Sequence, residues 1–135
     1  MAAVTLVDSS AWVEYLRGTG SAVHRAVTTR LEAGSELAST DVVSMEILAG
    51  ARSDKERDSL RRLLQGCAQM PVDGPNDYER AADLYRACRR RGETPRKLTD
   101  CLIAAVAIRN KVEVLHSDSD FVTIARHTPL RLAEI

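Results

Sequence analysis

The sequence lacks several features that would place it in a familiar class of protein. It has only three cysteines, with no C-x-x-C pair, and its three histidines are not spaced as metal ligands usually are. No apolar run approaches the length of a membrane span, and no basic segment precedes the first apolar residues. A disulfide scaffold, a zinc site, a membrane protein and a secreted protein are therefore not expected, and free thiols indicate the cytoplasm.

The chain is long enough and apolar enough for one compact domain. Its 135 residues are 44% hydrophobic, which predicts a single domain over 1–135 with a real core. The formal net charge is zero, so bulk charge indicates no partner. Of the 19 basic residues 16 are Arg, whose planar side chain pairs well with phosphates and carboxylates. This bias fits an anionic partner and equally fits a GC-rich genome.

Apolar runs alternate with amphipathic segments, which is typical of a parallel α/β sheet with helices on both faces. Short strands are expected at 4–7, 36–39, 70–72, 112–116 and 130–135, with Pro71 marking an edge. Helices are expected at 9–17, 21–32, 41–49, 54–65, 77–91 and 100–110, and a short one after the turn at 117–121. The helix over 100–110, with Thr99 as its cap, is apolar on nearly all sides and should lie at the centre of the fold.

Two acids follow predicted strands directly. Asp8 ends the apolar run that begins at Val4, and Asp118 follows the strand at 112–116. In open α/β sheets, ligands bind beyond the carboxyl ends of the strands. Both acids also have a simpler interpretation as helix N-caps, because Asp accepts the unpaired N–H groups of a first helical turn.

Two further acids lie in apolar helices. Glu46 shares its helical face with Val42 and Val43, although it equally fits the polar back of that helix. Asp100 lies in the first turn of the most apolar helix, where the positive helix end favours any acid. Four acids at one rim of a sheet would repel one another unless a cation neutralised them. Oxygen ligands favour Mg²⁺, with Mn²⁺ as a substitute, and such an ion activates water against a phosphate ester.

Four motifs, in this order, resemble those of the PIN-domain ribonucleases, specifically the VapC-type toxins of toxin–antitoxin pairs: V-D-S-S-A-W, S-M-E-I-L-A-G, L-T-D-C-L-I-A-A-V-A and H-S-D-S-D-F. The resemblance extends from Val4 to Leu132. It implies a PIN-like three-layer α/β/α sandwich whose mostly parallel sheet has about five short strands. It also implies that the catalytic, metal-binding acids are Asp8, Glu46, Asp100 and Asp118, with Asp120 as a further metal ligand and Ser10 as a supporting hydroxyl. His116 stands where the family often has Thr and receives no role.

The resemblance further implies a Mg²⁺-dependent endoribonuclease that cleaves cellular RNA, such as tRNA or rRNA, and arrests translation and growth. It implies a homodimer and a hetero-oligomer with a VapB-type antitoxin. Basic residues that would contact RNA, unless they are only a solvated helix end, are Arg86, Arg89, Arg90 and Arg96. Apolar residues that would receive an amphipathic antitoxin segment are Trp12, Tyr15, Leu16, Ile47 and Leu48, where Trp12 and Tyr15 equally fit the core.

Two other functions fit part of the pattern. A receiver-type signalling domain also binds Mg²⁺ with acids at strand ends, but it needs a good central strand before its acceptor Asp and a Lys after a later strand. Here Met70 to Asp73 is a poor candidate for that central strand. Lys97 and Lys111 each come before a predicted helix or strand, and neither follows a strand as the receiver's Lys does. An inactive PIN-like binding module has the same fold, although intact acids favour activity. A phosphatase with an Asp-x-Asp nucleophile is excluded by Asp8-Ser9-Ser10.

Overall fold

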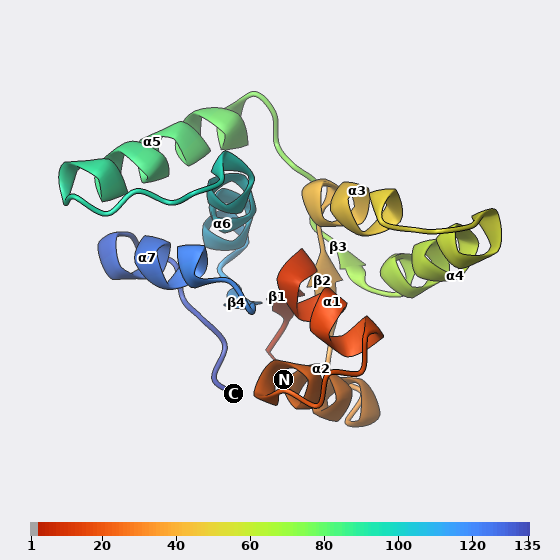
Figure 1. Ribbon diagram of the computed structural model, residues 1–135. Helices are drawn as coiled ribbons and strands as arrows, with labels where there is room; N and C mark the ends of the chain where they lie inside the picture. The colour runs from red at the N-terminus through yellow and green to blue at the C-terminus, as the bar shows by residue number, and fades with distance from the viewer. Residues whose placement is uncertain (1–2) are drawn as a thin grey trace.

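The computed structural model describes residues 3–135, which form a four-stranded parallel sheet and seven helices (Figure 1). The strands are β1 (Thr5–Val7), β2 (Leu37–Ser39), β3 (Ala68–Gln69) and β4 (Glu113–Leu115). The helices are α1 (Ser9–Leu16), α2 (Ala22–Glu32), α3 (Asp41–Ala49), α4 (Asp54–Gln65), α5 (Asn76–Arg90), α6 (Leu98–Asn110) and α7 (Ser119–His127). The predicted α/β arrangement with a parallel sheet is confirmed.

The order of the strands across the sheet is β3-β2-β1-β4, and all three pairings are parallel. The connections from β1 to β2 and from β2 to β3 step in one direction, whereas the connection from β3 to β4 returns across the sheet. Because such crossovers are right-handed, α1 to α4 lie on one face and α5 and α6 on the other. In Figure 1, α5, α6 and α7 lie to the left of the strands, α3 and α4 lie to the right, and α2 lies below. All strands end at one rim.

Helix α6 is the centre of the core. Every residue from Asp100 to Ala107 is buried, and α6 contacts α3, α5, α7 and β4. Fully buried Trp12 and Phe121 bring α1 and α7 into the same core. Each such side chain contributes about 1.5–3 kcal/mol through burial. Among residues 3–135, no helix is both long enough and apolar enough to cross a membrane.

The structure differs from the sequence prediction at two strands. The strand expected at 70–72 lies at 68–69, although it does occupy an edge of the sheet as expected. Pairing ends where the Met70 N–H donates to the Ser39 carbonyl, because Pro71 has no N–H to continue the ladder. The strand expected at 130–135 is reduced to one parallel bridge between Leu132 and Val114. The sheet therefore has four strands instead of about five.

A buried ion pair joins α5 to α6. Asp77 is fully buried, and its carboxylate accepts hydrogen bonds from the Arg109 guanidinium at 2.9–3.2 Å and from the Arg80 guanidinium at 3.2 Å. The same Arg109 also donates to the Pro71 carbonyl at 2.8 Å. Burial opposes ionisation of Asp77, but these hydrogen bonds outweigh it and hold the pKa of Asp77 below its usual value. The pair fixes the segment after β3 against the central helix.

Candidate functional site

The two carboxylate oxygens of Asp8, at the carboxyl end of β1, have different surroundings. Oδ2 accepts hydrogen bonds from the Ser10 backbone N–H at 3.0 Å and from the Ser10 hydroxyl at 2.6 Å. That hydroxyl accepts from the Ser117 N–H at 2.8 Å, which ties the end of β1 to the segment after β4. Oδ1 is buried and has no hydrogen-bond partner within residues 3–135. Asp8 thus caps α1 with one oxygen and leaves the other for a ligand.

Three other acids come together at the same rim. Asp100, Asp118 and Asp120 each have a carboxylate oxygen within 4.8 Å of the other two. Asp118 is the N-cap of α7 and accepts the Asp120 N–H at 2.9 Å, so its predicted capping role also holds. The proximity of Asp120 raises the pKa of Asp100. Oδ2 of Asp100 is a second buried carboxylate oxygen without a partner in the described chain.

Two cations from the loop before α6 lie against these acids. The Arg96 guanidinium contacts Asp118 Oδ1 at 2.8 Å and Asp120 Oδ1 at 3.3 Å. The Lys97 ammonium lies 3.1 Å from Asp118 Oδ2 and 3.9 Å from Asp100 Oδ2. The sequence analysis placed Arg96 among the basic residues of a helix end and missed these contacts, which depend on the loop folding back towards α7.

The acids differ in their tendency to ionise. Burial and the neighbouring acids Asp120, Asp8 and Asp118 together raise the pKa of Asp100 to about 8, although the Lys97 ammonium lowers it. Burial likewise raises the pKa of Asp8, against the hydrogen bonds from Ser10. For Asp118, burial is outweighed by hydrogen bonds from Asp120, Lys97 and Arg96, and the pKa falls below its usual value. Ionisation of Asp100 and Asp8 is therefore opposed by their surroundings, and a hard divalent cation would favour it.

Asp120 also determines where α6 begins. Its Oδ2 accepts the backbone N–H groups of Arg96 at 3.0 Å and Lys97 at 3.1 Å. The expected cap, Thr99, lies inside the helix, whose N-cap position is Lys97 and carries no side-chain cap. A carboxylate from α7 thus satisfies N–H groups at the start of α6. Both oxygens of Asp120 accept hydrogen bonds, and one of them also lies in the three-acid cluster, so its role as a metal ligand stays a prediction.

Glu46 and His116 are connected to the rim less directly. Glu46 Oε1 accepts the Ser9 hydroxyl at 2.7 Å, so α3 is joined to the residue after Asp8. From the sequence, Ser9 was considered only as a helix cap and as a hydroxyl in place of the family's usual Thr, and it was not assigned to the site. His116 accepts the Asp118 N–H through Nδ1 at 3.2 Å and packs against the Phe121 ring. It therefore supports the turn that carries Asp118.

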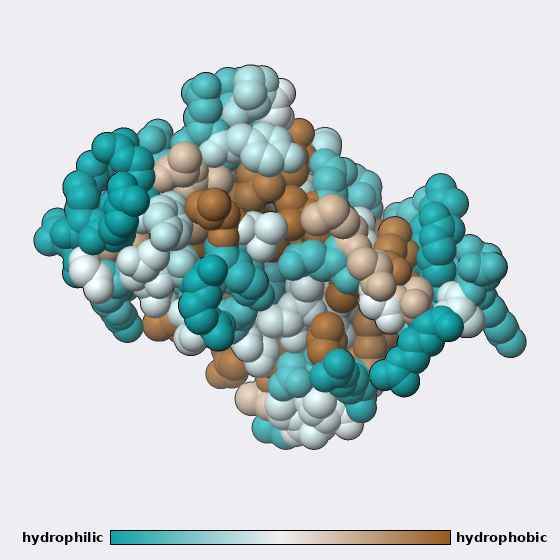
Figure 2. All heavy atoms as spheres, turned by 45° about the horizontal axis from the view of Figure 1, so that its top comes forward, coloured by the Kyte–Doolittle hydropathy of each residue, from teal (hydrophilic) through white to brown (hydrophobic). Residues whose placement is uncertain are grey.

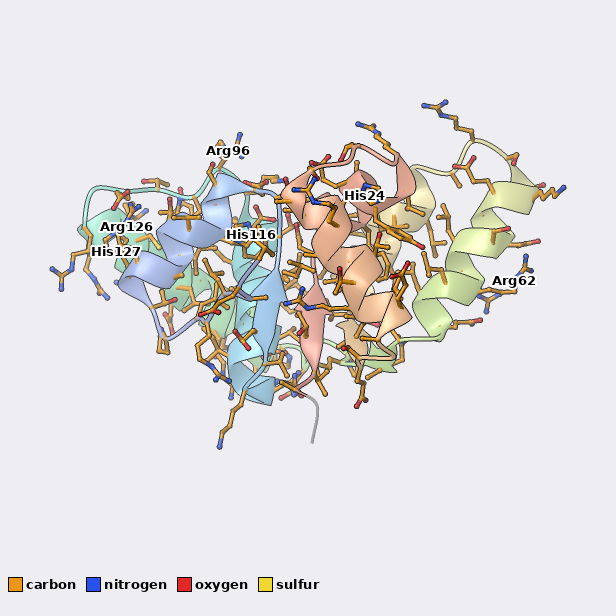
Figure 3. All side chains as sticks on the ribbon, turned by 90° about the horizontal axis from the view of Figure 1, so that it is seen from below. His24, Arg62, Arg96, His116, Arg126 and His127 are labelled. Carbon is orange, nitrogen blue, oxygen red and sulfur yellow. The ribbon has the colours of Figure 1, made fainter. Side chains whose placement is uncertain are left out.

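The predicted basic residues separate into two groups. Arg96 belongs to the acid cluster, whereas Arg86, Arg89 and Arg90 are exposed on α5 and none of their ion pairs in the described chain reaches the acids. The loop between α5 and α6 is held along α7 at both ends. Glu93 pairs with Arg126 and His127 near the end of α7, while Arg96 pairs with the acids at its start (Figure 3).

The expected antitoxin surface is only partly exposed. Trp12 is fully buried and Ile47 is 6% exposed, because α1 and α3 turn these side chains into the core. Of the two interpretations of Trp12 that the sequence left open, its burial supports the core residue over the partner contact. Leu16 is 44% exposed and, with Ile47 and Glu46, lines a groove of about 470 Å³ between α1, α3 and α4. Figure 2 shows hydrophobic spheres between the hydrophilic α4 on the right and the body of the molecule.

Comparison with known proteins places this geometry in a family. A family model described as the PIN domain matches residues 5–127. Ribonuclease VapC11 of Mycobacterium tuberculosis is 46% identical over 129 residues, which cover 95% of this chain and 96% of the relative. Ribonuclease VapC51 of the same organism is 34% identical over 107 residues, covering 79% of this chain and 77% of the relative.

Solved structures show the same fold at low sequence identity. VapBC2 from Rickettsia felis, solved with a DNA fragment from its promoter, has a TM-score of 0.73 at 13% identity and covers 96% of this chain and 97% of its own. VapBC-1 from nontypeable Haemophilus influenzae has a TM-score of 0.74 at 12% identity, with 97% of both chains covered. The fold, the ordered motifs and the curated relatives agree, and the chain belongs to the PIN-domain family, among the VapC ribonucleases.

Proposed function

We propose that this protein is the toxin of a type II toxin–antitoxin pair and cleaves cellular RNA in the cytoplasm with the help of Mg²⁺. The observation that carries the proposal is the pair of buried carboxylate oxygens, Asp8 Oδ1 and Asp100 Oδ2, which lack hydrogen-bond partners in the described chain. An unpaired buried carboxylate oxygen is costly unless a cation contacts it. Together with Asp118, these oxygens suit a hard divalent ion, so the residues present fit a Mg²⁺ site.

Asp8, Asp100 and Asp118 would hold the ion, with Glu46 completing the set from α3 and Asp120 acting mainly through the loop. A bound divalent ion supplies Lewis acidity at a phosphoryl oxygen and a water of lowered pKa. The chain itself provides orientation. Ser10 fixes Asp8, His116 supports the turn at Asp118, and Asp120 fixes the start of α6. The substrate we expect is tRNA or rRNA, whose cleavage would arrest translation.

The first test is cleavage of RNA by the purified protein. Total cellular RNA incubated with Mg²⁺ should acquire a small set of new 5′ ends, which sequencing would place on tRNA or rRNA. Chelation with EDTA should remove them, and Mn²⁺ should restore them. New ends that persist at full yield in EDTA would contradict a metal-dependent reaction, and an Asp8→Asn preparation controls for contaminating nucleases.

The exposed arginines of α5 provide the surface for a second prediction. Arg89 and Arg90 lie at the end of α5, which leads through the α5–α6 loop to the acid cluster. If they contact RNA phosphates, exchanging both for Glu should weaken RNA binding about tenfold or more at low salt. It should also flatten the salt dependence, because binding releases fewer counterions when fewer phosphates are contacted. Filter binding at several salt concentrations measures this. An Arg57→Glu plus Arg61→Glu variant on α4 is the matched control, and equal affinities for both variants would refute the assignment.

The groove between α1, α3 and α4 is the surface that we propose for a VapB-type antitoxin. Leu16 and Leu60 line its apolar part and Glu46 lies in its wall, so an amphipathic helix carrying a basic residue fits it. Expression of the toxin alone should arrest growth, and co-expression of the small gene beside it should restore growth. Leu16→Asp should abolish the rescue but not the arrest, whereas Leu31→Asp on α2 should be rescued normally. Light scattering of the complex should show two toxin copies.

A further inference from the structure

The side chain of Lys97 lies against the acids although half of it is exposed to solvent. Its ammonium is 3.1 Å from Asp118 Oδ2, within hydrogen-bond distance, and 3.9 Å from Asp100 Oδ2, which is too far for a hydrogen bond. The exposed fraction of the side chain is 51%. The charge of Lys97 therefore lies between two of the proposed metal ligands, in the place where a cation is needed.

The side chain of Arg96 contacts the acids in a different way from that of Lys97. Its guanidinium contacts Asp118 Oδ1 and Asp120 Oδ1, and its own backbone N–H donates to Asp120 Oδ2. The backbone N–H groups of Arg96 and Lys97 both donate to Asp120, so the two residues differ in their side chains. Within residues 3–135, the Arg96 guanidinium bonds to both acids at the start of α7 and makes no ion pair with Asp100. Lys97 makes one short contact through a flexible four-carbon stem, and its ammonium is a compact, strongly hydrated charge. Of the two cations, Lys97 can leave the acids at lower cost.

Building on the proposed metal site, we propose that Lys97 is a resident counter-cation that competes with the divalent ion for Asp118 and Asp100. Without metal, its ammonium neutralises part of the acid cluster. When a divalent ion binds these carboxylates, the ammonium is repelled and turns outward on its stem. Lys97 thus weakens metal binding and makes the metal-free site more stable.

Two measurable consequences follow from this competition. Removal of the Lys97 charge should tighten divalent-ion binding, because the ion no longer displaces a cation. The expected gain is about fivefold or more, the lower end of the coupling usually measured between two bound ligands. The same change should lower the melting temperature of the metal-free protein, because Asp118 and Asp100 lose a neutralising neighbour.

The test is titration of metal-free protein with Mn²⁺ by calorimetry, together with thermal melting in EDTA. Lys97→Met keeps the length of the stem without its charge, and Lys97→Gln repeats the removal of charge with a polar side chain. Lys55→Met, on the exposed face of α4, is the matched control and should behave as wild type. Tighter Mn²⁺ binding and a lower metal-free melting temperature in both Lys97 variants would support the proposal.

The experiment distinguishes failure of the Lys97 proposal from failure of the proposed metal site. If wild type binds Mn²⁺ and Asp118→Asn abolishes that binding, but the Lys97 variants bind no tighter than wild type, the competition is refuted while the proposed metal site stands. If wild type itself binds no Mn²⁺ at millimolar concentration, both the metal-dependent function and the competition are refuted. Weaker binding in the Lys97 variants would make Lys97 a contributor to the metal site and would overturn the proposal.

Discussion

Exchange of Asp100 for Asn is expected to reduce RNA cleavage about 100-fold or more, the scale seen when one preorganised electrostatic group is removed from an active site. Asn has nearly the same shape as Asp but cannot supply a negative oxygen to a metal. Asp100 offers a buried carboxylate oxygen that accepts no hydrogen bond in the described chain. The loss should therefore appear in the cleavage rate at saturating Mg²⁺, measured on a defined RNA fragment.

The same variant should fold and should be more stable without metal. Burial and the neighbouring acids raise the pKa of Asp100 to about 8, so its carboxyl group is unfavourable in the folded protein at neutral pH unless it binds a proton or a cation. A neutral amide removes this cost, and each gain of about 1 kcal/mol would raise the melting temperature by roughly 3–6 °C. Asp83→Asn, on the exposed face of α5, is the control. Wild-type cleavage by the Asp100→Asn protein would show that the site is assigned wrongly.

Exchange of Asp77 for Asn is expected to lower the free energy of unfolding by about 3 kcal/mol, the typical cost of leaving one partner of a buried ion pair without its charge. Arg109 would keep its contact with Pro71 but lose its carboxylate partner in the α5–α6 interface. Urea denaturation measures the change. Asp83→Asn should be neutral, and combining Asp77→Asn with Arg109→Met should recover part of the loss.

The Asp77 pair also sets a direction for acid unfolding. An Asp whose pKa is about 3.9 in the unfolded chain and lower in the folded protein contributes stability that is complete above pH about 3.9. Since the pKa of Asp77 is lowered, this contribution is lost as pH falls through its folded value. The stability difference between wild type and Asp77→Asn should therefore shrink below pH 4. A constant difference down to pH 2 would show that charge is not the reason for the effect.

Local sequence patterns predicted the central helix and the two central strands of the sheet. The apolar stretch from Cys101 to Ala107 could only be a central helix, and the runs ending at Val7 and Leu115 could only be buried strands. The edge strand at 68–69 was predicted two residues late, because Pro71 was included in a strand that its missing N–H ends. The last segment looked like a strand although only Leu132 makes a bridge to β4.

The site was predictable as a set of acids but not as a network. Asp8 and Asp118 stand after strands, so parallel pairing alone brings them to one rim. The contacts of Lys97 with Asp118, and of Asp120 with two backbone N–H groups, join residues more than 20 positions apart. Sequence spacing carries no information on such contacts. Trp12 was ambiguous for the same reason, since its burial depends on which face of α1 packs against the neighbouring helices α2 and α3.

The α5–α6 loop, which is held along α7 by Glu93 at one end and by Arg96 at the other, has a consequence for local unfolding. The loop and the start of α6 cannot detach from α7 independently, so these segments should open as one cooperative unit. The amide hydrogens of Arg96 and Lys97, both donated to Asp120, lie at the centre of that unit. Their exchange with solvent therefore reports directly on how often the acid cluster comes apart.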